Sequence, residues 1–217
     1  MPKALIFDLD GVIVDTAHYH FIAWQRLAKE LGITFTEKEN ERLKGVSRMR
    51  SLEIILEIGD VSLSPEKMEG LATKKNAWFV EYVEAIKPEE IFLGVKEMIT
   101  NLRSKGYKIA LASSSKNAEM VLRLLQIKNL FDAVVDGTMI THSKPDPEIF
   151  LLAASRLGID PSQCVVFEDA EAGVEAAIAA GMKCVGVGSA EQLGKANAIV
   201  KTTADFKIDQ LERLFLN

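Results

Sequence analysis

Short apolar runs that alternate with helical periodicity constrain the fold of this 217-residue chain more than any other feature. The runs have the length of strands and lie near residues 4–9, 108–112, 133–136, 164–168 and 183–187, with a shorter one near 198–200. Segments with helical spacing separate them, an alternation typical of a parallel sheet that carries helices on both faces. We therefore predict an α/β fold with a Rossmann-like parallel sheet core.

Two of the helical segments carry clear boundary signals. A helix is predicted over residues 146–157, because Asp146 suits the N-cap and Gly158 lies just past the end. Pro147 fits the first helical position, where its missing N–H is not needed. A similar helix is predicted over residues 171–180.

The alternation breaks once, between residues 15 and 87, where only helical patterns occur. A helical block of this length between the first and second strands predicts an inserted domain. Pro88 and Gly94 mark the return of the chain to the sheet. We predict a core domain of residues 1–14 and 88–217 and an α-helical cap domain of residues 15–87.

Asp8 and Asp10 follow the first apolar run directly and are themselves followed by Gly11. If the run is a buried parallel strand, both carboxylates emerge at its carboxyl end, where open α/β sheets bind ligands. Two carboxylates there can hold a hard cation and leave one oxygen as a nucleophile. The tetrapeptide alone fits simple turn chemistry equally well. The interpretation as a site therefore depends on partners elsewhere in the chain.

Further polar side chains follow three other predicted strands. Residues 113–117, Ser-Ser-Ser-Lys-Asn, suit an anion such as phosphate, although they could simply cap the next helix. Lys144 lies on a loop, where a lysine is usually solvated. Glu168 and Asp169 end a strand, and such a pair usually complements a helix dipole. Because the carboxyl ends of parallel strands meet at one edge, these groups can join Asp8 in one site.

This combination of groups suits phosphoryl transfer to a carboxylate. A carboxylate that attacks a phosphate meets charge repulsion, which a divalent cation and a fixed ammonium offset. The predicted oxygen ligands of one Mg²⁺ per chain are Asp8, Asp10, Glu168 and Asp169. The transfer also needs a proton donor and donors to the equatorial oxygens. Asp10, Lys144 and either Ser113 or Ser114 can take these roles.

Four stretches resemble, in order, the motifs of the haloacid dehalogenase (HAD) superfamily. They are DLDGVIVDT (residues 8–16), ASSSKN (112–117), SKPDPEIF (143–150) and FEDAEAGVEAAIAAG (167–181). By that resemblance Asp8 is the phosphorylated nucleophile and Asp10 the general acid and base. Ser113 and Lys144 would hold the phosphate, and Glu168 with Asp169 would help to hold Mg²⁺.

The predicted cap resembles that of the sugar phosphomutases of this superfamily, in residues 15–24, 43–48, 51 and 75–76. The resemblance implies Mg²⁺-dependent interconversion of β-D-glucose 1-phosphate and glucose 6-phosphate, with β-glucose 1,6-bisphosphate as intermediate and activator. The implied substrate contacts are His20, Trp24, Lys44, Gly45, Val46, Ser47, Arg48, Ser51, Lys75, Asn76, Ser114, Ser115, Lys116 and Asn117. Two residues depart from the mutase pattern, Ser114 in place of alanine and Val14 in place of threonine.

The cap residues also have plainer interpretations. His20 and Trp24 are four residues apart and share one helical face, which would suit a packed core equally well. Arg48 offers a planar fork suited to a second phosphate, although an arginine of this kind is usually solvated. A second phosphate site is what a mutase needs and a simple phosphatase does not.

Two rival functions stay open. A sugar-phosphate phosphatase would use the same core groups and release phosphate to water. A noncatalytic phosphosugar-binding protein would keep the fold, although a binder has no need of the nucleophile and acid pair Asp8 and Asp10.

Composition and charge limit the kinds of partner that we expect for this protein. The net charge is −5 without a basic block, which argues against nucleic acid, and no apolar run approaches the roughly 18 residues of a membrane span. Because Met1, Pro2 and Lys3 lead straight into a strand, we expect no signal peptide and a cytoplasmic protein. Cys164 and Cys184 are expected to be buried, reduced thiols. We expect a monomer whose partner is a small phosphorylated sugar.

Overall fold

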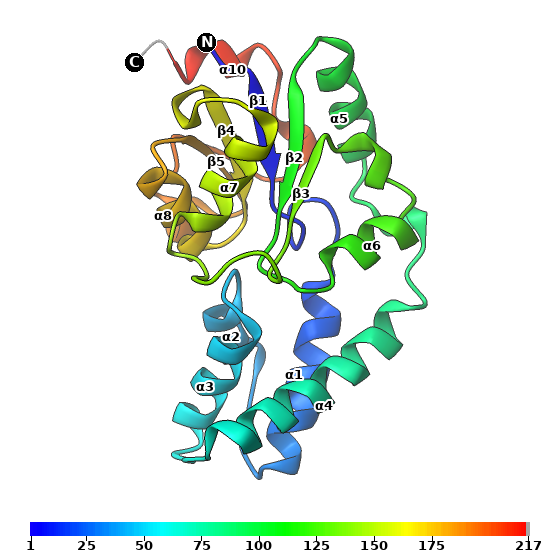
Figure 1. Ribbon diagram of the computed structural model, residues 1–217, viewed down its shortest axis with the longest axis vertical. Coiled ribbons are helices and arrows are strands. Elements are labelled where there is room, and N and C mark those ends of the chain that lie inside the picture. The colour runs from blue at the N-terminus through cyan, green and yellow to red at the C-terminus, as the bar shows by residue number, and fades with distance from the viewer. Residues whose placement is uncertain (216–217) are drawn as a thin grey trace.

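A six-stranded parallel sheet forms the centre of the computed structural model, which describes residues 1–215 (Figure 1). The strands are β1 (Ala4–Phe7), β2 (Lys108–Ala112), β3 (Ala133–Val135), β4 (Cys164–Glu168), β5 (Lys183–Val187) and β6 (Ala198–Val200). They lie in the order β3-β2-β1-β4-β5-β6, and every neighbouring pair is parallel. The predicted α/β class with a parallel sheet is confirmed.

Ten α-helices belong to residues 1–215. They are α1 (Ala17–Glu30), α2 (Glu37–Asn40), α3 (Arg48–Ile58), α4 (Pro65–Val83), α5 (Val95–Ser104), α6 (Ala118–Leu124), α7 (Glu148–Leu157), α8 (Glu171–Ala179), α9 (Ala190–Leu193) and α10 (Gln210–Arg213). Short 3-10 helices are η1 (Glu41–Leu43), η2 (Pro88–Glu90), η3 (Lys128–Leu130), η4 (Pro161–Gln163) and η5 (Thr203–Asp205). In this range no helix combines the length and apolar character that crossing a membrane requires.

The sheet has a separate apolar core on each face because side chains alternate along a strand. Leu5 and Phe7 of β1 are fully buried in the cluster that includes residues of α5, α6 and α10. Ala4 and Ile6 are fully buried in the second cluster, with residues of α7, α8 and α9. Both faces are therefore covered, as a parallel sheet requires.

Element boundaries differ from the predictions at a few residues. β1 ends at Phe7 rather than at residue 9, because the Leu9 carbonyl accepts N–H groups of the following turn. Helix α7 begins at Glu148, with Pro147 rather than Asp146 at the N-cap. Asp146 still acts on the helix start, because its Oδ1 accepts the Glu148 N–H at 2.9 Å. Gly158 closes this helix in the left-handed conformation, as predicted.

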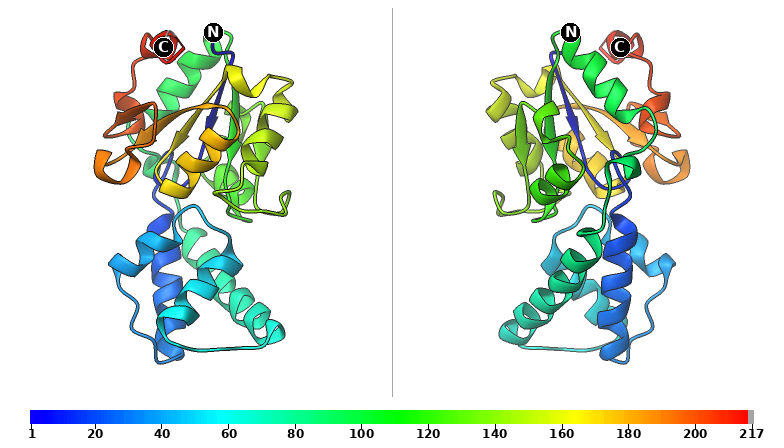
Figure 2. Two further views of the ribbon diagram at one scale, coloured as in Figure 1. Left: turned by 90° about the vertical axis from the view of Figure 1, so that its left-hand side faces the viewer. Right: turned by 90° about the vertical axis from the view of Figure 1, so that its right-hand side faces the viewer.

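Helices α1 to α4 form a compact group, here called the helical unit, next to the carboxyl ends of the strands (Figures 1 and 2). Its own apolar cluster includes Trp24, Leu27, Leu52 and Ile55. Phe79, near the end of α4, belongs instead to a cluster of the sheet. The N-terminus lies at the far end of the core from the helical unit (Figure 2).

Candidate active site

Most of the predicted residues line one cavity, at the point in the sheet where the strand order reverses. β1 pairs with β2 on one side and with β4 on the other, so loops leave the sheet in opposite directions beyond β1. Ligands of open α/β sheets bind at such a point. An open cavity lies here, between the sheet and the helical unit.

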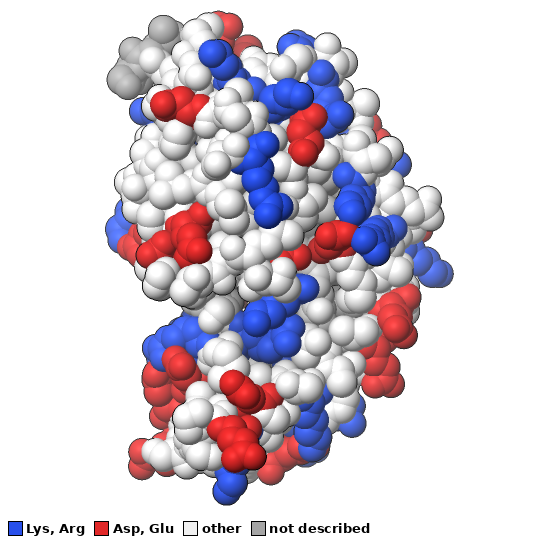
Figure 3. All heavy atoms as spheres, viewed as in Figure 1, with Lys and Arg blue, Asp and Glu red and all other residues white. Residues whose placement is uncertain are grey.

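Residues from both units line this cavity. From the sheet side come Asp8, Asp10, Ser113, Ser114, Ser115, Lys116 and Asp169. From the helical unit and the segments that adjoin its helices come Ala17, His20, Trp24, Asn40, Leu43, Lys44, Gly45, Val46, Arg48, Ser51 and Lys75. Lys and Arg side chains also gather on the surface at the level where the two units meet (Figure 3).

Lys144 joins two of the predicted carboxylates beneath the cavity. Its Nζ donates to Asp8 Oδ1 at 2.6 Å and to Glu168 Oε1 at 2.5 Å. Burial alone would lower the pKa of Lys144, but the carboxylates of Asp8 and Glu168 outweigh it and raise the pKa above its ordinary value. The ammonium therefore stays charged and fixes one oxygen of Asp8. This contact spans 136 residues of sequence, and it agrees with the predicted meeting of strand ends.

Asp10 has the environment of a proton donor. Among the described residues its Oδ1 is buried and has no hydrogen-bond partner. Burial, with the nearby negative charges of Asp8 and Asp15, raises the pKa of Asp10 from 3.8 to about 8. A carboxyl group with this pKa carries a proton at neutral pH and can exchange it near the reacting oxygens.

Gly11 allows Asp169 to approach the loop that carries Asp8 and Asp10. Its backbone has φ +73°, and a Cβ there would lie only 2.1 Å from Asp169 Oδ2. Burial and the charges of Glu168 and Asp8 raise the pKa of Asp169 well above its ordinary value. Acidic groups therefore crowd together at this edge of the sheet.

The four predicted metal ligands do not form one tight set. Within residues 1–215, the side-chain oxygens of Asp8, Asp10, Glu168 and Asp169 are not all within 4.8 Å of one another. Glu168 is engaged elsewhere, since its Oε1 contacts Lys144 and its Oε2 accepts the Ala170 N–H at 2.8 Å. The contact with Lys144 therefore occupies one oxygen of Glu168, as it does one oxygen of Asp8.

The serine loop after β2 lies at the cavity and also orders the start of the next helix. Ser113, Ser114 and Ser115 line the cavity. Ser113 Oγ accepts the Ser115 N–H and Ser115 Oγ accepts the Asn117 N–H, each at 3.2 Å, so these hydroxyls also order the start of α6. Ser114 Oγ instead donates to the Gly45 carbonyl of the helical unit at 2.8 Å.

Cationic side chains reach the cavity from the helical unit. Lys75 is 1% exposed, and its Nζ lies 2.6 Å from His20 Nδ1 and 4.4 Å from the centre of the Trp24 ring. Burial, together with Arg48, lowers the pKa of Lys75 well below its ordinary value. Burial, Lys75 and Arg48 likewise lower the pKa of His20, which is therefore a neutral acceptor. Trp24 lines the cavity and is also part of the apolar cluster of the helical unit, as the packing interpretation of this helix predicts.

Some predicted residues do not line the cavity. Ser47 is the N-cap of α3, where its hydroxyl accepts the Arg50 N–H. Asn76 and Asn117 bond to each other across the two units, with Asn117 Nδ2 donating to Asn76 Oδ1 at 2.8 Å. Conversely, the sequence did not single out the lining residues Ala17, Asn40 and Leu43. Ala17 and Leu43 nevertheless lie within two of the segments that resemble the cap of the mutases, 15–24 and 43–48, whereas nothing in the local sequence marks Asn40.

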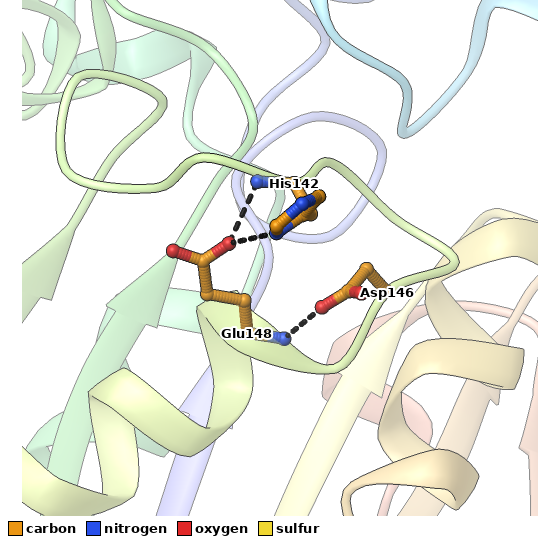
Figure 4. Close-up of side chains that lie close together, drawn as sticks. All are labelled: His142, Asp146 and Glu148. Carbon is orange, nitrogen blue, oxygen red and sulfur yellow. Dashed lines mark hydrogen bonds and ion pairs between the residues drawn. The ribbon is translucent and has the colours of Figure 1, made fainter.

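A compact polar cluster holds the loop that carries Lys144 (Figure 4). His142, Asp146 and Glu148 each place a possible ligand atom within 4.8 Å of the others. The Glu148 carboxylate accepts the N–H groups of Thr141 and His142 at 2.9 and 2.7 Å, and these bonds lower its pKa. The cluster therefore orders the loop just before Lys144.

With this geometry established, comparisons with known proteins identify the family. A family model described as haloacid dehalogenase-like hydrolase matches residues 2–181. The chain belongs to this family. The resemblance seen in the four sequence motifs is thus confirmed.

Similar proteins include both mutases and phosphatases of this family. The chain is 44% identical to a β-phosphoglucomutase of Bacillus subtilis, over 96% of this chain and 93% of the relative. It is 35% identical to a phosphorylated carbohydrates phosphatase of Thermotoga maritima, over 93% and 92% of the two chains. The crystal structure of a β-phosphoglucomutase from Clostridium difficile superposes with a TM-score of 0.96 at 43% identity, covering 99% of this chain and 97% of that one.

Proposed function

We propose that this HAD enzyme interconverts β-D-glucose 1-phosphate and glucose 6-phosphate, as β-phosphoglucomutases do. The observation that carries the proposal is a cavity with cationic side chains on both sides. Lys116 lines this cavity from the sheet side, with Lys144 beneath the cavity on Asp8, while Arg48 and Lys75 line it from the helical unit. A sugar that carries two phosphates needs such groups at both ends. The likeness to the B. subtilis mutase along nearly the whole chain supports the same activity.

The proposed transfer uses Asp8 as the nucleophile and Asp10 as the proton carrier. Phosphorylated Asp8 gives its phosphoryl group to the 6-hydroxyl of β-glucose 1-phosphate, and Asp10 takes up the hydroxyl proton. The resulting β-glucose 1,6-bisphosphate turns round in the cavity. Asp8 then attacks the phosphorus at position 1, and Asp10 returns the proton to the departing sugar oxygen. The pKa of about 8 at Asp10 suits both directions of proton transfer near neutral pH.

The residues present fit a divalent cation. Four carboxylates converge on this edge of the sheet, while one ammonium, Lys144, bonds to two of them. We propose that Asp8 and Asp169 hold Mg²⁺, with Glu168 beside them on Lys144 and with Asp10, the proton carrier, as the fourth carboxyl group at this edge. The bound ion would offset the charge on the transferring phosphoryl group.

The remaining site residues are proposed contacts to the sugar or to its second phosphate. In this assignment Ser113, with Lys144, holds the phosphate at Asp8. The other proposed contacts are His20, Trp24, Lys44, Gly45, Val46, Ser47, Arg48, Ser51, Lys75, Asn76, Ser114, Ser115, Lys116 and Asn117. We further propose that the helical unit acts as the cap, with domain boundaries at residues 1–14 and 88–217 for the core and 15–87 for the cap.

A sugar-phosphate phosphatase is the second candidate, because the similarity to the T. maritima phosphatase also covers nearly the whole chain. The two functions differ in their products. Incubation with Mg²⁺, β-glucose 1-phosphate and catalytic glucose 1,6-bisphosphate should yield glucose 6-phosphate with little free phosphate. Free phosphate in amounts equal to the sugar consumed, without glucose 6-phosphate, would overturn the mutase assignment. Binding without any turnover would favour a noncatalytic protein.

A further inference from the structure

Ser114 makes a contact that differs from those of its neighbours in the serine loop. Its hydroxyl donates to the Gly45 carbonyl at 2.8 Å, and this hydrogen bond joins the sheet side of the cavity to the helical unit. The hydroxyls of Ser113 and Ser115, in contrast, accept N–H groups of their own loop. Ser114 is therefore the serine of this loop that responds to the position of the helical unit.

Gly45 lies close to the groups that perform the proposed chemistry. A Cβ added at Gly45 would lie 3.2 Å from Ala170 Cβ and 3.8 Å from Lys144 Cδ. The backbone at Gly45 has φ +72°, a conformation that glycine adopts without strain. The loop can therefore approach the core closely at this point. In this arrangement Asp8 is 5% exposed and Lys144 is 1% exposed.

The sheet side of this contact is well anchored. A Cβ at Gly137, after β3, would lie 2.2 Å from the Ser114 carbonyl oxygen, so the two backbones pack directly together. The Gly137 N–H also donates to the Ser115 carbonyl at 3.3 Å. Ser114 consequently presents its hydroxyl from a fixed backbone, and the position of the Gly45 loop decides whether the hydrogen bond exists.

We propose that Ser114 is a positioning residue that holds the Gly45 loop over Asp8 and so controls whether the phosphoryl group passes to sugar or to water. This inference rests on the proposed function. Because the bond exists only when the loop lies against the core, it stabilises the closed arrangement and not the open one. Closure excludes water from the aspartyl phosphate. In the competing hydrolysis a water oxygen bonds to phosphorus, the bond to Asp8 breaks and Asp10 takes up the water proton.

The test is Ser114→Ala in the full-length enzyme with Mg²⁺, β-glucose 1-phosphate and glucose 1,6-bisphosphate. Loss of one neutral hydrogen bond should reduce the closed population about two- to tenfold. We expect KM for β-glucose 1-phosphate and the free phosphate released per glucose 6-phosphate each to rise by about that factor, with kcat little changed. Thermal unfolding should change little, because the apolar clusters of the sheet and of the helical unit do not include Ser114 or Gly45.

Ser104→Ala provides a matched control. The exposed Ser104 hydroxyl also donates to a backbone carbonyl, that of Asn101, but within helix α5 and away from the cavity. This variant should keep wild-type kinetics. A Ser114→Ala enzyme with unchanged KM and phosphate release would overturn the proposal, as would a fall in kcat alone, which would indicate direct action on the reacting groups.

The two levels of inference can fail separately. Wild-type enzyme that forms no glucose 6-phosphate would refute the proposed function. In that case the role of Ser114 would be tested in the phosphatase reaction, by comparing KM for phosphate release between the wild type and Ser114→Ala. The substitution should still raise this KM. An equal KM in both enzymes would refute it.

Discussion

Replacement of Lys144 by methionine should destabilise the protein strongly and in a pH-dependent manner. The Lys144 and Glu168 side chains are fully buried, and that of Asp8 is 8% exposed. Methionine keeps much of the packing beside Phe150, over whose ring the ammonium lies at 5.0 Å, but it removes the positive charge. Breaking a buried ion pair by removal of one partner costs about 3–5 kcal/mol. That is a large share of the free energy of unfolding of a typical native protein, which is roughly 5–15 kcal/mol.

The pH dependence follows from the carboxylate that loses its partner. Burial raises the pKa of Glu168, Lys144 opposes that effect and Asp8 adds to it. Without Lys144 the folded-state pKa of Glu168 lies further above its ordinary value of 4.5. The additional loss of unfolding free energy in Lys144→Met is therefore largest at pH values above the raised pKa of Glu168. It disappears as the pH falls toward 4.5, where Glu168 binds a proton in both the folded and the unfolded state. The Lys144 charge itself does not change in this range, because its pKa is raised.

Urea unfolding of the wild type and of Lys144→Met, with EDTA present, measures this difference at about pH 7.5 and about pH 5. The control is Lys108→Met, which removes an exposed ammonium 3.5 Å from Asp132 and should cost less than about 1 kcal/mol at either pH. If Lys144→Met lost the same free energy of unfolding at both pH values, or lost no more than the control, the buried-pair argument would be refuted.

Three further predictions concern activity. Asp8→Asn should abolish formation of glucose 6-phosphate in a coupled assay, because the amide cannot accept the phosphoryl group. Arg48→Ala should lower kcat/KM of the mutase reaction about 10- to 100-fold and affect hydrolysis of the bisphosphate less; unchanged mutase kinetics would remove Arg48 from the second phosphate site. Glu148→Ala should lower kcat by loosening the loop before Lys144, whereas equal kcat would show that its two backbone hydrogen bonds do not position that lysine.

The sheet and its strand-end residues were predictable because they depend on local patterns and one topological rule. Buried parallel strands read as apolar runs, and their carboxyl ends meet at one edge. Asp8 and Lys144 could therefore be expected to meet although they are distant in sequence. The N-cap of α7 was placed one residue early, at Asp146, whose carboxylate does accept the Glu148 N–H although Pro147 is the N-cap.

Contacts set by the docking of the two units could not be read from the sequence. Glu168 follows a strand as a metal ligand would, but its two oxygens bond to Lys144 and a backbone N–H. Asn40 is the last residue of the short helix α2, and it lines the cavity only because this helix lies beside the cavity. The hydrogen bond from the Ser114 hydroxyl to the Gly45 carbonyl was likewise not predicted. Such pairings depend on three-dimensional approach, for which neither periodicity nor spacing gives a signal.

The separate apolar cluster of the helical unit has a consequence for how this protein can diversify. Helices α1, α3 and α4 stabilise one another through residues such as Leu27, Leu52 and Ile55, which do not belong to the clusters of the sheet. Substitutions on the inner surface of these helices can thus alter which sugar is accepted while the phosphorylation machinery on the sheet stays intact. We therefore expect variants that differ only at cavity-lining side chains of the helical unit to keep a folded sheet with Asp8 and Lys144 in place.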